Sequence, residues 1–141
     1  MTAITIHKTE KPSDGEYART LEILRTFTRS SVPILDNHDF ALLLKDKANV
    51  LVGGLIAQSR WGGFHIDILT LSEHLRGQGW GKTLLKKAET EARARKCHHM
   101  RLDTYAFQAR AFYEAHGFEV FGQIDGPEPY YPHYFMMKPL A

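Results

Sequence analysis

The chain has 141 residues, the size of one domain with a core of its own, and its 43% hydrophobic and 24% charged residues are typical of a globular protein. A formal net charge of +2 argues against a broad nucleic-acid-binding surface, and the single cysteine, Cys97, excludes an internal disulfide and suits a reducing compartment. Because we find no signal-peptide pattern and no apolar run of membrane-spanning length, we expect a cytoplasmic protein without a membrane partner.

The N-terminal third predicts a strand, a helix and a hairpin. Residues 2–7 alternate between polar and apolar side chains, as a strand does. Ser13 or Asp14 can cap a helix over about 15–28, which is followed by a loop. The apolar runs 40–45 and 49–57, joined by a short polar turn, predict a hairpin, and Gly53-Gly54 in the second run indicates a bulge or a close approach of two backbones.

The middle of the chain predicts a strand–helix–strand unit. Residues 64–71 form the first strand, a helix runs to about Lys96, and residues 98–104 form the second strand. Such a unit should be parallel and right-handed. The buried stripe of the helix is expected to consist of Trp80, Leu84, Leu85, Ala88 and Ala92.

The C-terminal part completes an α/β protein. Residues 107–116 predict a short helix that ends at Gly117, and 118–124 and 133–138 predict two more strands. Strands with interspersed helices indicate layered α/β architecture, which we expect to form a single domain over residues 1–141.

A glycine-rich loop stands before the central helix. Gly77, Gly79 and Gly81 alternate with larger residues, and Arg76 and Lys82 flank them. Glycine lets backbone N–H groups face a ligand, and the first N–H groups of a helix have no partner inside it. Together with the helix dipole, these features predict an anion site of the kind that holds phosphate.

Three kinds of phosphate loop compete for this stretch. The dinucleotide fingerprint G-x-G-x-x-G fails because the third glycine comes one residue early and the loop follows the wrong strand of the fold. The Walker A loop matches only at Gly81-Lys82-Thr83, because Arg76 stands where its first glycine should be. The loop of coenzyme A acetyltransferases, R/Q-x-x-G-x-G/A, matches Arg76 to Gly81 at each defined position.

A second motif supports the third reading. Residues 109–122, "ARAFYEAHGFEVFG", follow the loop at the right separation and resemble A-x-x-(L/F)-Y-x-x-x-G-F of the GNAT superfamily of N-acetyltransferases. The chain is also similar to a group of short bacterial members of that family. It departs from many members at Ala106, where they carry Asn, so Gln108 could take over a contact to the cofactor.

The resemblance implies a fold and a cosubstrate. The fold would be a mixed, mostly antiparallel sheet of about six to seven strands, with a central parallel strand–helix–strand unit and helices on both faces. Acetyl-CoA would be the acetyl donor, with its pyrophosphate on backbone N–H groups of the loop and its pantetheine arm paired with the strand end. The residues expected to bind it are Leu69, Thr70, Leu71, Arg76, Gly77, Gln78, Gly79, Trp80, Gly81, Lys82 and Gln108.

The resemblance suggests the general acid, and the strand before the glycine loop suggests candidates for the base. Tyr113 matches the tyrosine of the second motif and would protonate the departing thiolate. His65 and Asp67 should share one face of their strand, and either could deprotonate the amine, directly or through water. Glu73 is a third candidate for the base, although a solvated loop charge explains this residue better. A backbone N–H near the strand end would stabilise the oxyanion.

We therefore expect an acetyl-CoA-dependent N-acetyltransferase that acts on a primary amine of a small molecule, and less readily on a peptide or protein. No metal is needed. A non-catalytic acyl-CoA-binding module is the alternative, and a nucleotide-binding protein is a second one. Residues 128–135, "EPYYPHYF", could wall the acceptor site or simply pack, and homodimer formation stays open.

Overall fold

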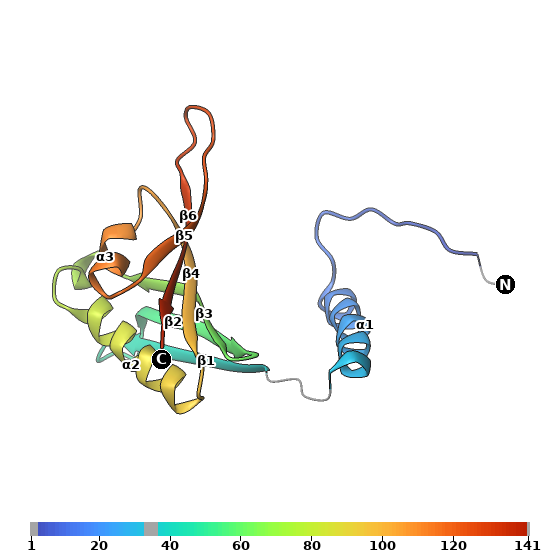
Figure 1. The fold of residues 1–141 in the computed structure, drawn as a ribbon, viewed down its shortest axis with the longest axis horizontal. Coiled ribbons are helices and arrows are strands. Elements are labelled where there is room, and N and C mark those ends of the chain that lie inside the picture. Colours follow the sequence, from blue (N-terminus) through green and yellow to red (C-terminus); the bar gives the residue numbers. More distant parts are fainter. Residues whose placement is uncertain (1–2, 33–36, 141) are drawn as a thin grey trace. The chain divides into compact units, whose positions relative to one another are not determined.

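The computed structural model describes residues 3–32 and 37–140 of the chain. They fall into two compact units, Met1–Leu35 and Asp36–Ala141 (Figure 1). The first unit holds one helix, and the second unit holds the sheet and the remaining helices.

The helix of the first unit, α1 (Asp14–Ser31), begins with a capping box. The hydroxyl of Ser13 accepts from the N–H of Glu16 at 3.1 Å, and the Glu16 carboxylate accepts from the N–H of Ser13 at 2.8 Å. The predicted helix is confirmed and runs three residues further than expected. The strand predicted over 2–7 is wrong for residues 3–7, because an alternating pattern makes a strand only where a partner strand pairs with it, and the described part of the chain supplies none.

The second unit is a six-stranded sheet with two helices (Figure 1). Its elements are β1 (Asn37–Lys45), β2 (Leu51–Arg60), β3 (Gly63–Leu71), a short 3₁₀ turn η1 (Glu73–Leu75), α2 (Trp80–Ala94), β4 (His99–Tyr105), α3 (Arg110–Ala115), β5 (Glu119–Ile124) and β6 (His133–Pro139). The strand order is β1-β2-β3-β4-β6-β5, and only β3 and β4 run parallel. The predicted mixed, mostly antiparallel sheet is confirmed, whereas helices on both faces stay a prediction because α1 belongs to the other unit.

The β1–β2 hairpin has the features that its sequence predicts. The Asp46 carboxylate accepts from the N–H groups of Ala48 and Val50, which closes the turn. A Cβ atom at Gly53 would lie 2.8 Å from the carbonyl oxygen of Thr70 on β3. The close backbone approach predicted for this glycine is therefore confirmed.

One face of the sheet carries the core, which α2 and α3 cover. Its largest fully buried side chains are Phe64, Leu55, Met100 and Met136. The predicted stripe of α2 is confirmed for Leu84, Leu85, Ala88 and Ala92. Trp80 is the exception: it opens the helix at the edge of the core and is 40% exposed, so its expected burial is wrong.

Two irregularities of β3 shape the centre of the sheet. The parallel pairing of β3 with β4 covers only Gly63–His65 against His99–Arg101, so the two strands part beyond it. The register of β3 with β2 also skips Asp67, which makes a β-bulge there. The bulge shifts the alternation, so that Leu69 and Leu71 pack on the same core as Phe64.

Candidate active site

The glycine loop has a backbone that favours glycine. Gly77 and Gly79 have φ values of +76° and +85°, and a Cβ atom added at either would meet no protein atom within 4 Å. Gly79 is also the N-cap of α2, whose first backbone hydrogen bond runs from the N–H of Thr83 to its carbonyl at 3.0 Å. The N–H groups of residues 80–82 therefore precede the intrahelical bonds and are available to an anion.

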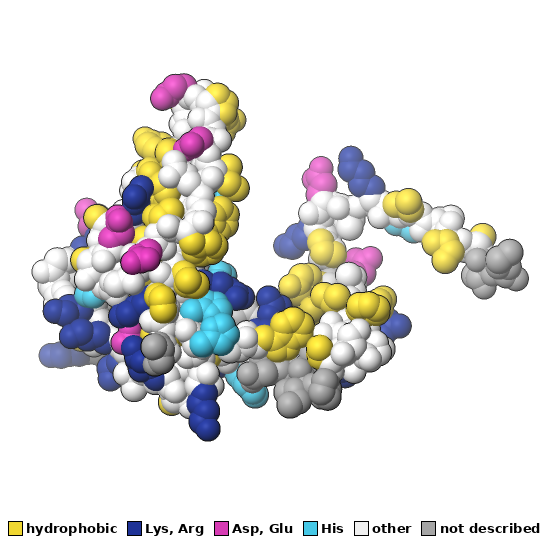
Figure 2. Space-filling view, in the orientation of Figure 1, with side chains coloured by type: hydrophobic (Ala, Val, Ile, Leu, Met, Phe, Trp, Pro, Cys, Tyr) yellow, Lys and Arg dark blue, Asp and Glu magenta, His cyan; other side chains and the backbone are white. Residues whose placement is uncertain are grey.

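A cleft of about 520 Å³ lies between this loop, the end of β3 and α3. It is lined by Leu69, Thr70, Leu71, Arg76, Gly81, Phe107, Gln108, Ala109, Phe112 and Tyr113. Seven of these were expected site residues, whereas Gly77, Gln78, Gly79, Trp80 and Lys82 lie in the loop and helix start next to it. Figure 2 shows Lys and Arg side chains gathered over the part of the second unit where this loop and α2 lie.

Gln108 and Gln78 both use their side chains locally. The Gln108 side-chain oxygen accepts from the N–H of Tyr105 at 2.9 Å, which ties the turn after β4. The Gln78 amide donates to the carbonyl of His74 at 2.8 Å and so braces the glycine loop. Phe112, which sequence reasoning missed, packs against Gly81, where an added Cβ would lie 3.4 Å from its ring.

Tyr113 lies at the inner end of this cleft, on α3. The residue is 7% exposed, and burial raises the pKa of its hydroxyl to about 12. A phenol with a raised pKa keeps its proton throughout the neutral range. Tyr113 is thus placed and protonated as a donor would be.

A second cleft, of about 330 Å³, passes through the gap where β3 and β4 part. Tyr113 and Gln108 line it on the helix-covered side, and Asp67 and Asp103 line it from the strands. The gap therefore connects Tyr113 with two carboxylates of the other sheet face. A third hollow, between β1, β2 and β3, is lined by no ionisable side chain and is less suited to proton transfer.

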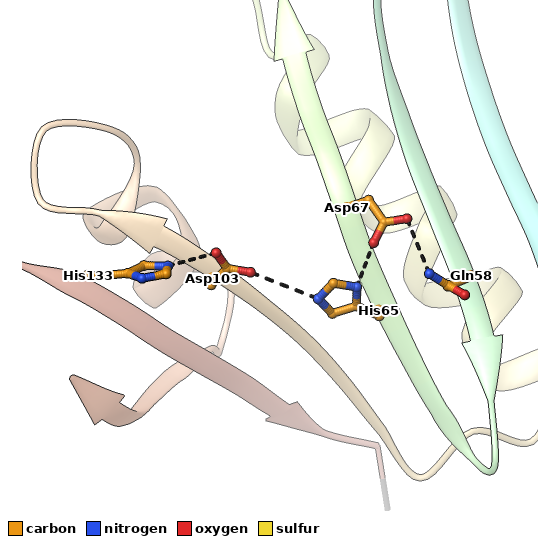
Figure 3. Close-up of polar contacts among 5 residues, drawn as sticks. All are labelled: Gln58, His65, Asp67, Asp103 and His133. Atoms are coloured by element: carbon orange, nitrogen blue, oxygen red, sulfur yellow. Dashed lines mark hydrogen bonds and ion pairs between the residues drawn. The ribbon is translucent and has the colours of Figure 1, made fainter. Parts of the chain in front are cut away.

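Four ionisable side chains form a chain of contacts beside the second cleft (Figure 3). His65 Nδ1 lies 2.6 Å from Asp67 Oδ1, so the predicted placement of these two residues on one face is confirmed. His65 Nε2 lies 4.0 Å from Asp103 Oδ1, and the other oxygen of Asp103 lies 2.7 Å from His133 Nε2. Gln58, on β2, contacts the second oxygen of Asp67 at 3.5 Å.

The contacting carboxylates determine which ring nitrogen carries the proton in His65 and in His133. An ionised carboxylate only accepts hydrogen bonds, so Asp67 requires the proton on His65 Nδ1, and Asp103 requires it on His133 Nε2. Neutral His65 therefore presents the lone pair of Nε2 toward Asp103. This is the arrangement of a general base whose ring a carboxylate orients.

Sequence reasoning missed Asp103 and His133. His133 stacks on Tyr105 with ring centroids 4.3 Å apart and an angle of 12° between the planes, and it also contacts Phe135. The two residues of the pair are 30 positions apart, and the pairing of β4 with β6 brings them together. Only the aromatic-rich stretch 128–135 hinted that the chain returns to the site there.

Comparisons with known proteins identify the family of this chain. The model of the Acetyltransferase (GNAT) family matches residues 4–118. "Acetyltransferase Atu2258" of Agrobacterium fabrum is 35% identical over 92 residues, which are 65% of this chain and 66% of that protein. "Blasticidin-S acetyltransferase" of Streptomyces morookaense is 32% identical over 91 residues, 64% of this chain and 67% of that protein.

The chain belongs to the GNAT acetyltransferase family. A crystal structure described as a putative acetyltransferase from Agrobacterium tumefaciens shares the fold, with a TM-score of 0.90 and 23% identity over 97% of this chain and 100% of that one. The chain is matched over about two thirds of the length of these two curated relatives. The predicted family and fold are confirmed, and the family supports an acetyl-transferring enzyme, as expected.

Family membership also bears on the donor. GNAT acetyltransferases use acetyl-CoA as the acetyl donor. In the described residues, no helix is long and apolar enough to cross a membrane. The individual site residues, the acceptor and the oligomeric state stay predictions.

Proposed function

We propose that this protein transfers an acetyl group from acetyl-CoA to a primary amine of a small molecule. The observation that carries the proposal is the gap between β3 and β4, which joins the glycine-loop cleft and Tyr113 on one side to Asp67 and Asp103 on the other. Donor and acceptor could thus meet from opposite faces of the sheet. The Streptomyces morookaense relative is a blasticidin-S acetyltransferase, and its small-molecule substrate supports a small acceptor here.

The glycine loop suits the pyrophosphate of acetyl-CoA. Positive φ angles and open space at Gly77 and Gly79 let the backbone approach a ligand closely, and Arg76 lines the cleft with a positive charge. The edge of β3 that faces the gap lacks a strand partner beyond His65 in the described sheet. That edge can pair with the amide groups of the pantetheine arm, as an added strand would.

The reaction then needs one base and one acid. His65 Nε2 accepts a proton from the acceptor's amine, directly or through one water, while Asp67 holds the ring at Nδ1. The amine nitrogen attacks the thioester carbon, and a backbone N–H of residues 69–71 stabilises the oxyanion. The carbon–sulfur bond breaks, Tyr113 gives its proton to the thiolate, and an amide and free CoA leave.

A panel of primary amines tests the proposal. With acetyl-CoA as donor, release of the CoA thiol should depend on the added amine, and mass spectrometry should find a product heavier by one acetyl group. Acetyl-CoA at 100 times its Kd should also stabilise the protein by about 2.7 kcal/mol, whereas ATP should not. Stabilisation by acetyl-CoA without transfer to any amine would instead favour the non-catalytic acyl-CoA-binding module.

We also propose that residues 1–141 act as one acetyltransferase domain. The family match over residues 4–118 spans both compact units, which supports this extent. A protein truncated to residues 37–141 should then bind acetyl-CoA more weakly or unfold at a lower temperature than the whole chain. Equal values for both proteins would restrict the domain to the second unit.

A further inference from the structure

We propose that Asp103, held by His133, anchors the positively charged amine of the acceptor beside His65, which makes a cationic alkylamine the preferred substrate. The inference rests on the proposed acetyl transfer and names the chemical class of its acceptor. In it, Asp103 contacts the substrate, and His133 is a positioning residue.

The distance between His65 and Asp103 is the first argument. Their facing atoms, Nε2 and Oδ1, are 4.0 Å apart, which is too long for a hydrogen bond between them. Both atoms accept hydrogen bonds when His65 is neutral, so a donor must lie between them if both are to be satisfied. An ammonium group, with three N–H donors, can serve both at once.

The position of Asp103 is the second argument. Its side chain is 44% exposed and lines the cleft that also reaches Tyr113, so an acceptor in that cleft meets its carboxylate. Asp67 lines the same cleft, but its Oδ1 accepts the short hydrogen bond from His65 and its Oδ2 contacts the amide of Gln58. Oδ1 of Asp103 instead faces His65 Nε2 across 4.0 Å, without a hydrogen bond between the two atoms.

His133 holds Asp103 in place. The N–H of His133 binds Oδ2 at 2.7 Å and leaves Oδ1 facing His65 (Figure 3). The ring of His133 is itself fixed between Tyr105, at 4.3 Å, and Phe135, at 4.5 Å. A carboxylate held at one oxygen loses less rotational freedom when the other oxygen binds a ligand.

The charged side chains around His65 favour the binding of one cation. Asp67 and Asp103 flank the ring, and Arg101 is its register neighbour on β4. On β2 the register neighbour is the neutral Gln58. With the two carboxylates against the one guanidinium, the immediate surroundings favour an added positive charge.

The proton balance follows from this arrangement. The acceptor enters as an ammonium ion and donates one N–H to Asp103 Oδ1. It gives another proton to His65 Nε2 and becomes the neutral nucleophile. His65 passes this proton to solvent and takes the second one from the nitrogen after it has attacked the thioester carbon, because the amide keeps only one of the three ammonium protons. Tyr113, which has given its proton to the thiolate, is reprotonated from solvent.

The test compares two sets of primary amines in the CoA-release assay. Alkylamines such as benzylamine and agmatine are cationic at pH 7.5, whereas the amino groups of arylamines such as aniline and 4-aminobenzoate are uncharged. Asp103→Asn should raise the KM for alkylamines about tenfold to a hundredfold, as expected when a hydrogen bond to a charged group is lost. The KM for acetyl-CoA should change less than twofold, and the KM for arylamines less than threefold.

Asp125→Asn is the matched control. Asp125 is exposed after β5 and bonds only to the nearby Gln123 in the contacts of the structure, so the same change of charge there should leave every KM unaltered. His133→Phe keeps a flat ring but removes the donor to Asp103, and it should raise the KM for alkylamines like Asp103→Asn. His133→Gln, which can still donate, should restore part of the loss.

The double variant decides whether His133 acts through Asp103. Asp103→Asn combined with His133→Phe should be no worse than Asp103→Asn alone, because the second change removes a contact that serves the first residue. Two outcomes would overturn this proposal in a wild-type protein that acetylates amines. One is a double variant whose rise in KM equals the product of the two single rises, and the other is an unchanged KM for alkylamines in Asp103→Asn. A wild-type protein that acetylates no amine of either set would overturn the proposed function itself.

Discussion

At the scale of single residues, Tyr113 combines two properties that a proton donor needs. It reaches both clefts, and burial holds the pKa of its hydroxyl near 12, so the proton is present wherever the enzyme is expected to work. Burial favours the neutral form, so this residue contributes stability that is complete below pH 10 and is lost as the pH rises through about 12.

Tyr113→Phe should therefore remove the proton and little else. We expect kcat to fall about 10²–10³-fold, the usual range for general acid catalysis, while acetyl-CoA affinity stays within twofold. Because Tyr113 stays protonated below pH 10, its ionisation should cause no fall in the wild-type kcat up to that pH. The pH profiles of wild type and Tyr113→Phe should therefore have the same shape in this range. Tyr17→Phe, which removes an exposed hydroxyl on α1, is the control. Steady-state kinetics that show near wild-type kcat in Tyr113→Phe would assign the proton to another donor.

The second residue-scale prediction concerns Gly79. Its φ of +85° disfavours any side chain, and the space around it is open for a ligand. Gly79→Val should weaken acetyl-CoA binding at least tenfold by calorimetry, which corresponds to about 1.4 kcal/mol. The thermal unfolding of the ligand-free variant must be recorded beside it. A folded variant with wild-type affinity would contradict the phosphate role of the loop.

Site residues whose role depends on their neighbours in the sequence were predictable. Site residues that meet only through strand pairing were not. The loop from Arg76 to Gly81 is a local pattern with a local cause, the backbone conformation of glycine. Asp103 reads as an ordinary polar residue of a strand until β6 brings His133 to it. The exposure of Trp80 was missed because helical spacing says nothing about where the core ends.

At the scale of elements, α2 is fastened to the sheet near its C-terminal end. The guanidinium of Arg95 donates to the carbonyls of His38 and Asp39 on β1 and to the hydroxyl of Ser59 on β2. It also lies 5.3 Å from the centre of the Phe40 ring. One side chain thus holds the helix to two strands. This requires the several N–H donors that the planar guanidinium group presents at once.

Arg95→Lys keeps the positive charge but loses the planar set of guanidinium donors. We expect the free energy of unfolding to fall by about 1–3 kcal/mol, the cost of hydrogen bonds lost to a charged group. Arg93→Lys on the same helix is the control, since its ion pair with Glu89 is half-exposed and should change stability by less than about 0.5 kcal/mol. Urea unfolding measures both. Equal losses of unfolding free energy in the two variants would show that the guanidinium hydrogen bonds of Arg95 do not stabilise the fold.

The elements themselves were largely predictable from their ends. A capping box begins α1, an Asp-centred turn joins β1 to β2, and Gly117 ends the segment of α3. The bulge at Asp67 was not predictable, because it depends on how β3 registers with β2 rather than on β3 alone. The expected N-terminal strand failed for the same reason, since alternation describes one strand and pairing needs two.

At the scale of the whole second unit, two antiparallel half-sheets meet at a short seam. Residues 37–71 build β1, β2 and β3, residues 99–139 build β4, β5 and β6, and three residues on each side pair between them. The chain therefore forms each half from neighbouring segments, and α2 bridges the two. The wide part of the seam is where we place the reaction.

The opened seam leaves a signature in amide hydrogen exchange. A strand points alternate N–H groups to either side, so those of residues 66–71 that face β2 are held by its ladder, and those that face the gap are open to water. Mass spectrometry of the free protein in D₂O should find fast and slow amides interleaved along this one strand. Saturating acetyl-CoA should slow the fast ones and spare the others. Uniform protection along β3 without ligand would mean that the gap is closed in solution.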